Sequence, residues 1–131
     1  MRVIKAYQPP GKEALFEKFL AQQDPKLRSK IRWTLFRLAQ MEHCELKEPH
    51  FKHFALERYS DLYEMREKSK ILVRVVFTFC DGDILLLTPF VKRESRDTMR
   101  ALEQSISMLA DVRRNPDYAV NYDFLEEKKR A

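Results

Sequence analysis

Glycine is nearly absent from this chain of 131 residues, which contains only Gly11 and Gly82. The chain therefore has no glycine-rich loop of the kind that cradles phosphate groups in nucleotide-binding proteins. Its two cysteines, Cys44 and Cys80, do not suggest a disulfide framework. The longest apolar stretch, around residues 84–87, is far too short to cross a bilayer. These absences predict a cytoplasmic protein with no membrane partner.

Metal-ligating residues are also few. Cys44, His50 and His53, with His43 beside them, are zinc ligands by residue type, but a second Cys-x-x-Cys arm is missing. Polar loop residues are the simpler interpretation of this group. The sequence therefore predicts no metal site and no cofactor.

What the chain has in quantity is charge of both signs. Lys and Arg number 25 against 20 Asp and Glu, which gives a net charge of +5 and a pI near 9.3. This excess of positive charge favours nucleic acid or an acidic protein as the partner. The length and the 44% of hydrophobic residues suit one domain with its own core. We expect this domain to cover residues 1–116, followed by a C-terminal tail at 117–131.

Hydrophobic periodicity and turn residues predict a mixed order of strands and helices. The predicted elements are a strand at 2–7, helices around 14–20 and at 25–41, a short strand near 54–56, strands at 62–68, 71–80 and 83–92, and a helix from 97 to about 115. Asp24 and Asp97 are the expected caps of the second and last helices. Asp81-Gly82 predicts a tight type I′ hairpin turn, which needs positive φ at both central residues.

This order predicts an α+β fold in which the strands at 62–92 form an antiparallel meander. We expect a two-layer domain, with the antiparallel sheet packed on one face against an N-terminal helical hairpin and a C-terminal helix. The other face is then partly open to solvent. Pro89 cannot donate to a strand ladder, so an edge position or a bulge is expected there. A bulge would turn Lys92 towards Arg74, whereas a regular hairpin would place Lys92 on the core face.

Strong cations interrupt the apolar strands of this meander. Successive side chains of a strand point to opposite faces, so Glu64, Arg66 and Lys68 share one face. In the next strand, Arg74 stands among apolar neighbours. Cations grouped on a small sheet imply an anionic ligand.

Four segments of the sequence carry a resemblance to a known family. They are the strand LYEMR, the strand ILVRVVFTF, the turn DGD and the stretch FVKRESRDTMRALEQSISML. They resemble the RelE/HigB-type toxins of bacterial toxin–antitoxin modules, in the phage-derived branch of the RelE/ParE superfamily. The resemblance implies a RelE/ParE-like fold and a cytoplasmic, metal-independent ribonuclease that cuts mRNA, commonly on the ribosome. It also implies a cognate antitoxin, which in this branch often carries a helix-turn-helix domain.

The resemblance leaves the activity open. The related ParE toxins share the fold but poison DNA gyrase, and a regulatory binding protein without catalysis is a further alternative. Many ribosome-dependent relatives carry a histidine or tyrosine near the end of the chain, whereas this chain has no histidine after His53. Tyr118 and Tyr122 lie in the predicted tail. Their side chains have two possible roles, stacking on a nucleobase or sealing an edge of the core.

Metal-free RNA cleavage needs a base for the 2′-hydroxyl, cations for the charge on the phosphorane, and an acid for the 5′-oxygen. By residue type, Arg66 and Arg74 are the candidates for stabilising this charge, since guanidinium groups offer two donors to phosphate oxygens. Glu64 is the candidate base. Alternatively, Glu64 pairs with Arg66 or Arg74 as a structural counterion.

Further cations complete the predicted site. Lys68 and Lys92 are candidates for holding the RNA backbone or for proton transfer, and Arg93 for the acid or a phosphate clamp. Lys70 and Arg96 are predicted to bind RNA.

A basic stripe on the second helix is the predicted partner-binding surface. It contains Lys30, Trp33 and Arg37. A solvated helix face is the other interpretation, and the aromatic side chain of Trp33 is what favours a partner.

Overall fold

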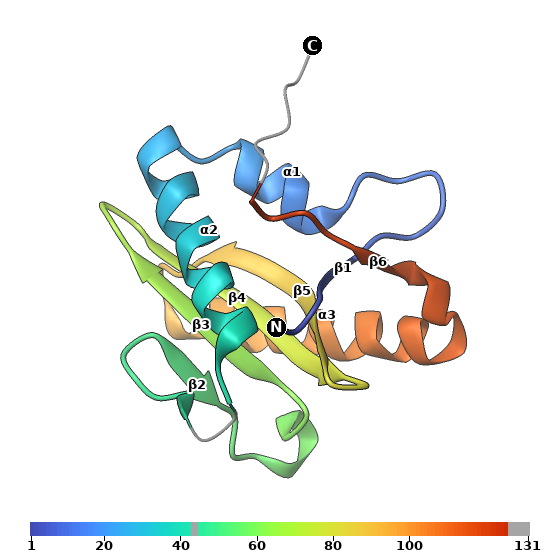
Figure 1. Ribbon diagram of the computed structural model, residues 1–131. Helices are drawn as coiled ribbons and strands as arrows, with labels where there is room; N and C mark the ends of the chain where they lie inside the picture. The colour runs from blue at the N-terminus through green and yellow to red at the C-terminus, as the bar shows by residue number, and fades with distance from the viewer. Residues whose placement is uncertain (43–44, 126–131) are drawn as a thin grey trace.

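The computed structural model describes residues 1–42 and 45–125, and within them six strands form one sheet that packs against three α-helices (Figure 1). In chain order, the elements are β1 (Ile4–Tyr7), α1 (Leu15–Ala21), α2 (Pro25–Gln40), β2 (Phe51–His53), η2 (Glu57–Tyr59), β3 (Tyr63–Lys68), β4 (Leu72–Cys80), β5 (Asp83–Val91), α3 (Ser95–Arg114), η3 (Pro116–Tyr118) and β6 (Ala119–Asn121). The predicted α+β class is confirmed. No helix in the described residues is long and apolar enough to cross a membrane.

The sheet has the strand order β2-β3-β4-β5-β1-β6. β3, β4 and β5 form the predicted antiparallel meander, whereas β1 joins β5 in parallel and β6 pairs with β1 antiparallel. The short strand expected near residues 54–56 lies instead at Phe51–His53, as the edge strand beside β3. Its position follows from the side chain of Phe51, which is buried in the core.

The hairpin between β4 and β5 is built by its two turn residues. Asp81 and Gly82 have φ angles of 51° and 82°, so both adopt the left-handed conformation that the predicted turn requires. Cys80 and Asp83 face each other across the ladder beside this turn. The turn thereby sets which residues of β4 and β5 are paired further along.

Pro89 lies on β5 opposite Val75 of β4, past residues 84–86, where the described pairing with β1 ends. On the β1 side, Pro89 therefore has the edge position considered for it. The pairing of β4 with β5 shifts register between Val75 and Phe77. Such an irregularity is expected near a proline that cannot donate to the ladder, and it confirms the bulge. Beyond the shift, Arg74 lies opposite Phe90 instead of Pro89.

Side-chain caps mark the starts of two helices. Asp24 accepts a hydrogen bond at 2.9 Å from a backbone amide in the first turn of α2, as predicted. α3 begins at Ser95, earlier than expected, because Glu94 is its capping residue. Asp97 accepts hydrogen bonds from the amides of Arg93 and Glu94 and so completes a capping box from inside the helix. The prediction of Asp97 as the cap itself is therefore wrong.

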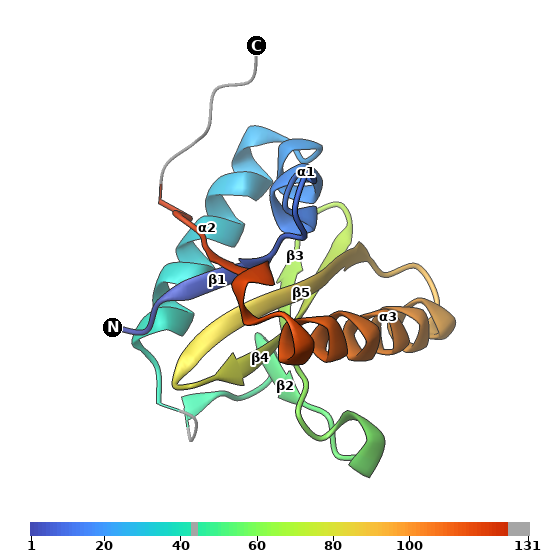
Figure 2. The same ribbon diagram turned by 90° about the vertical axis from the view of Figure 1, so that its right-hand side faces the viewer.

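The helices lie on both faces of the sheet, which corrects the expectation that one face carries them all. Figure 2 shows α3 on the side of the sheet opposite to α1 and α2. In β5, Ile84 and Leu86 point into a core shared with α1 and α2, whereas Leu85 and Leu87 point into a second core under α3. α3 packs mainly on β5 and less on β4, and β4 separates β5 from β3.

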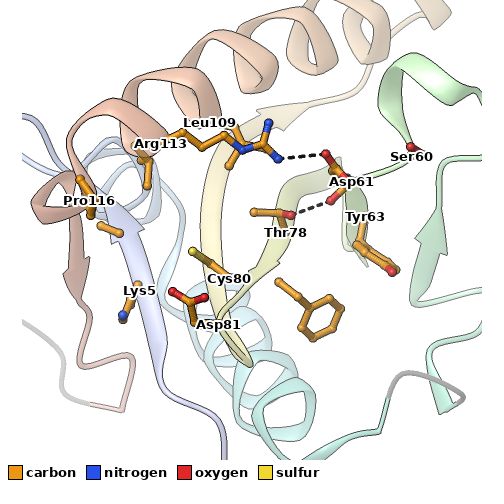
Figure 3. A pocket seen from close by; sticks show the side chains of 13 residues that line it. Lys5, Ser60, Asp61, Tyr63, Thr78, Cys80, Asp81, Leu109, Arg113 and Pro116 are labelled. Atoms are coloured by element: carbon orange, nitrogen blue, oxygen red, sulfur yellow. Dashed lines mark hydrogen bonds and ion pairs between the residues drawn. The ribbon is translucent and has the colours of Figure 1, made fainter.

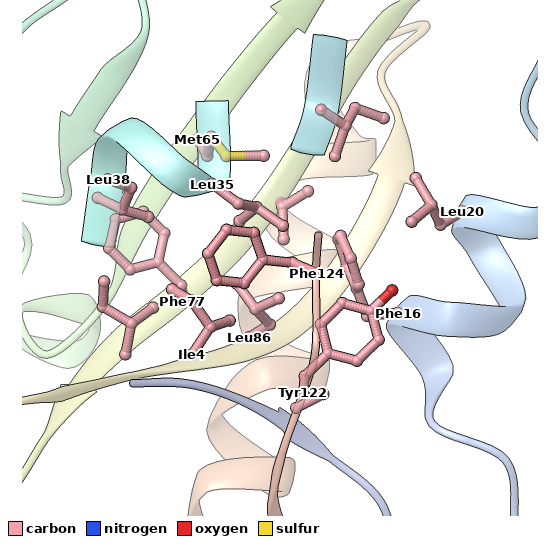
Figure 4. Close-up of a cluster of buried hydrophobic side chains, with 14 of the residues drawn as sticks. Ile4, Phe16, Leu20, Leu35, Leu38, Met65, Phe77, Leu86, Tyr122 and Phe124 are labelled. Atoms are coloured by element: carbon pink, nitrogen blue, oxygen red, sulfur yellow. The ribbon is translucent and has the colours of Figure 1, made fainter. Parts of the chain in front are cut away.

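Residues after α3 complete the first core (Figure 4). Tyr122 and Phe124 are buried there beside Phe16 of α1. The Tyr122 hydroxyl donates a hydrogen bond to Glu17, and burial together with this carboxylate raises the pKa of Tyr122. Tyr122 thus seals a core edge, which was one of its two predicted roles. Tyr122 and Phe124 belong to the segment expected as a C-terminal tail, and their side chains pack in the core. Residues 126–131 lie outside the described part.

Candidate active site on the third and fourth strands

Arg66 on β3 and Arg74 on β4 are direct partners across the ladder. Both side chains therefore leave the sheet on the face that also carries α3, while Met65 points into the core on the other face. The side chain of Arg66 is 21% exposed and that of Arg74 is 13% exposed. The two predicted phosphate-binding arginines thus meet at one partly open surface.

One carboxylate lies between these two arginines. The Glu64 side chain is 3% exposed, and its Oε1 accepts a hydrogen bond from Arg66 Nε at 2.9 Å and lies 3.6 Å from Arg74 Nη1. Two positive charges directly opposite each other destabilise a strand pair, and the shared oxygen offsets their repulsion. The structure therefore shows the counterion arrangement that was the alternative to Glu64 as a base.

The pairing leaves some hydrogen-bonding capacity unused. Among the described residues, Arg74 Nε and Glu64 Oε2 are buried without a hydrogen-bond partner. Burial lowers the pKa of Arg74, Glu64 opposes this shift, and the charge of Arg66 adds to it. A guanidinium that is partly withdrawn from water and keeps an unused N–H has a donor left for a further acceptor.

A second carboxylate reaches the pair from the segment before β2. Arg66 Nη1 lies 3.2 Å from Glu48 Oε1, and the Glu48 side chain is 66% exposed. The Arg66 amide donates to the carbonyl of His50 at 2.8 Å, which holds this segment beside β3. Sequence reasoning missed Glu48, because only the pairing of β2 with β3 brings it near Arg66. Glu48, Glu64, Arg66 and Arg74 together form an arginine cluster.

Lys92 lies on the same face of the sheet as Arg74. Arg74 is paired with Phe90, so alternation along β5 returns Lys92 to that face. The Lys92 amide donates to the carbonyl of Leu72 at 2.8 Å, which continues the ladder. This is the position expected for Lys92 if Pro89 causes a bulge.

The remaining predicted cations are exposed. Lys68 ends β3, Lys70 lies in the turn between β3 and β4, and Arg93 precedes α3. Arg96, in the first turn of α3, forms an ion pair with Glu94. Their exposure suits contacts with a phosphate backbone that passes the arginine cluster.

The predicted partner-binding residues lie along α2. The Trp33 side chain is 62% exposed and stacks on Phe36, with ring centroids 5.6 Å apart, beside a hollow of about 300 Å³. Lys30 donates from Nζ to the carbonyl of Lys68 at 2.7 Å, a contact between α2 and the end of β3 that the sequence did not predict. Arg37 is half-buried. Trp33 is therefore the exposed centre of this surface.

A separate cavity of about 450 Å³ lies between the end of α3 and the tip of the β4–β5 hairpin (Figure 3). Arg113 forms an ion pair with Asp61 at 3.0 Å at its rim, and the Thr78 hydroxyl donates to the Asp61 carbonyl at 2.6 Å. Lys5 and Cys80 also line it. Its described lining contains no residue of the predicted site, so the cavity is distinct from the arginine cluster.

In the part of the chain that the structure describes, no group of three or more His, Cys, Asp and Glu side chains is placed to hold a metal ion. His53 stacks on Tyr63 instead, with ring centroids 4.4 Å apart. His43 and Cys44, which were considered with it as zinc ligands, lie outside the described residues.

Most of the chain matches one known protein family. Residues 18–111 match the family described as Phage derived protein Gp49-like (DUF891). The chain belongs to the Gp49-like family. The Gp49-like family is associated with toxin–antitoxin modules and is related to RelE-type toxins. No curated protein and no solved structure matches the chain.

The Gp49-like match covers the candidate site completely. It begins within α1 and ends within α3, so it contains the whole arginine cluster and Lys92. β1 and β6, which pair with each other at the far side of the sheet, lie outside the match.

Proposed function

We propose that this Gp49-like chain is a RelE/HigB-type toxin of a type II toxin–antitoxin system that cleaves mRNA without a metal or cofactor. The observation that carries the proposal is the pair of partly exposed arginines, Arg66 and Arg74, with Lys92 on the same face. Such a pair offers several donors to the oxygens of one phosphate. The association of the family with toxin–antitoxin modules supports the same function.

The proposed reaction is attack of the 2′-hydroxyl oxygen on the neighbouring phosphorus. The P–O2′ bond forms as the P–O5′ bond breaks, so a base takes the 2′-hydroxyl proton and an acid gives a proton to the 5′-oxygen. Arg66 and Arg74 stabilise the charge that builds on the phosphorane oxygens. Lys68, Lys92 and Arg93 are the candidates for proton transfer and for clamping the backbone.

Glu64 has a different task in this proposal from that of a base. Its carboxylate is 3% exposed and is shared between Arg66 and Arg74. A base must reach the proton that it removes, directly or through one water. We therefore assign Glu64 to holding the two guanidinium groups together.

The proposed partners follow from the charge of the surface. The proposed substrate is mRNA in the cytoplasm, either bound to the ribosome or free. Lys70 and Arg96 extend the surface along which the RNA backbone lies. The inhibitor is a cognate antitoxin with a helix-turn-helix domain. An acidic segment with apolar side chains in that antitoxin suits the arginine cluster and the exposed Trp33.

Two incubations of the purified protein test this function, one with RNA and one with translating ribosomes, both in the presence of EDTA. The expected result is cleavage that persists in EDTA and falls about a hundredfold or more in Arg66→Ala and Arg74→Ala. Arg113→Ala is the matched control, because Arg113 is also ion-paired with a carboxylate but lies outside the arginine cluster. No cleavage in either setting, with growth arrest that survives loss of both arginines, would contradict the proposal.

A gyrase poison of the ParE type is the second candidate, and the exposed Trp33 is the observation that favours it. α2 contains five Lys and Arg residues and no acidic residue, and Trp33 lies among them. Inhibition of supercoiling that is lost in Trp33→Ala and kept in Arg74→Ala would select this function. Unchanged growth on induced expression would instead select a regulatory protein without catalysis.

A further inference from the structure

The arginine cluster is electrically balanced within itself. Arg66 and Arg74 bring two positive charges, and Glu64 and Glu48 bring two negative charges, through contacts of 2.9, 3.2 and 3.6 Å. A neutral cluster has little net attraction for an anion. One carboxylate therefore has to give way before an anionic ligand gains the full attraction of both arginines.

The two carboxylates differ in how firmly they are held. Glu64 belongs to β3, is 3% exposed and contacts both arginines, so loss of its charge would leave two cations facing each other with little water. Glu48 is 66% exposed and reaches Arg66 through an ion pair at 3.2 Å. Exposed ion pairs are weak, because water readily replaces each partner. Glu48 is thus the carboxylate that can leave.

We infer that the Glu48 carboxylate occupies the position on Arg66 that a phosphate oxygen takes in the bound state, and that a phosphodiester binds by displacing it. The choice of a phosphodiester as the ligand rests on the proposed function. Glu64 stays in place and keeps the two guanidinium groups side by side. The exchange preserves charge balance, because a phosphodiester carries the single negative charge that Glu48 withdraws.

The segment that carries Glu48 permits this exchange while the sheet stays intact. Backbone pairs from Phe51 to His53 hold β2 beside β3, and the Arg66 amide donates to the His50 carbonyl. These contacts do not involve the Glu48 side chain, so its rotation into water is sufficient. They also keep the carboxylate within reach after the ligand leaves. Glu48 therefore acts as a built-in competitor that a ligand with only one weak contact does not displace.

Binding of a fluorescently labelled 2′-O-methyl RNA oligonucleotide tests the exchange, because this probe keeps the phosphodiesters and lacks the 2′-hydroxyl needed for cleavage. Fluorescence anisotropy is measured for the full chain as wild type, Glu48→Gln and Glu57→Gln. Glu57 is an exposed acid on η2, so its variant matches the net charge of Glu48→Gln. We expect the Kd of Glu48→Gln to lie about two- to fivefold below that of Glu57→Gln, the difference that an exposed ion pair supplies.

The outcomes separate this inference from the proposed function. Equal Kd values for Glu48→Gln and Glu57→Gln overturn the exchange, even if the protein cleaves RNA. The exchange is supported if Glu48→Gln binds more tightly and this gain disappears when Arg66→Ala is added. If the same protein cleaves no RNA, the nuclease function is contradicted and the exchange still stands. Absence of binding by all three proteins overturns the exchange as well.

Discussion

Two groups of ion pairs in this protein differ in how completely their partners are matched. At η2, Arg58 donates from Nε and Nη2 to both oxygens of Glu103 at 2.9 and 2.5 Å, and the Tyr59 hydroxyl donates to the same carboxylate at 2.6 Å. In the arginine cluster, one buried carboxylate oxygen serves two guanidinium groups, and two buried atoms of the described residues lack partners. A fully hydrogen-bonded pair fastens one segment to another, whereas an incompletely hydrogen-bonded pair keeps unused donors and acceptors.

If solvent exposure alone were used to choose a candidate site, the Arg58–Glu103 pair would be preferred over the arginine cluster. The side chains of Arg58 and Glu103 are 61% and 47% exposed, well above the values for Arg66 and Arg74. The balance of donors and acceptors therefore identifies the arginine cluster as the candidate site, although it is the less accessible of the two. Removal of charges from each group tests this comparison.

The largest effect is expected from Glu64→Gln, which leaves Arg66 and Arg74 opposite each other without their shared counterion. We expect the free energy of unfolding to fall by about 2–3 kcal/mol, somewhat less than for a fully buried pair because Arg66 is partly hydrated. Urea unfolding followed by circular dichroism measures this change. Glu103→Gln is the matched control and should destabilise much less. Equal losses in the two variants would remove the distinction between the groups.

A smaller effect is expected from Lys92→Gln, which removes a cation from the face of the arginine cluster. Affinity for the 2′-O-methyl RNA probe should fall, and the slope of log Kd against log salt concentration should decrease by about 0.7, as for one phosphate contact to a single strand. Lys5→Gln, at the cavity, makes the same charge change and should leave the slope unaltered. A similar change of slope in both variants would show that only net charge matters.

The smallest effect concerns acid stability at η2. Hydrogen bonds from Arg58 and Tyr59 lower the pKa of Glu103 from 4.5 to about 2. A carboxylate with a lowered folded-state pKa stabilises the fold above its ordinary pKa, and this contribution is lost as the pH falls from about 4.5 to about 2. Thermal melts across this interval should therefore show a shallower fall of the melting temperature in Glu103→Gln than in wild type. Identical curves would mean that the pair contributes nothing to stability.

Sequence patterns predicted those parts of the fold that depend on neighbours in the chain. The Asp81-Gly82 turn and the Asp24 cap each involve only a few consecutive residues. The distribution of the helices over both faces, and the place of β1 between β5 and β6, depend on contacts between distant segments. Hydrophobic periodicity shows that a helix has an apolar side, and it does not show which sheet face that side covers.

The same limit separates the predicted from the unpredicted residues of the site. Strand alternation placed Arg66 and Arg74 correctly, and the bulge alternative at Pro89 placed Lys92. Glu48 was missed because a short strand was expected near residues 54–56, whereas the strand at Phe51–His53 brings the preceding turn beside Arg66. The cavity was missed because its lining comes from several segments that no single sequence pattern connects.

The position of β1 has a consequence for how the protein is made. β1 is the first of the described strands to be synthesised, yet it pairs with β5 on one side and with Ala119–Asn121 on the other. While residues 119–124 are still inside the ribosomal tunnel, the sheet cannot close and Tyr122 and Phe124 cannot seal the core. For a protein proposed to damage translation, this order of assembly delays the completed fold until the ribosome has extruded the segment that closes the sheet.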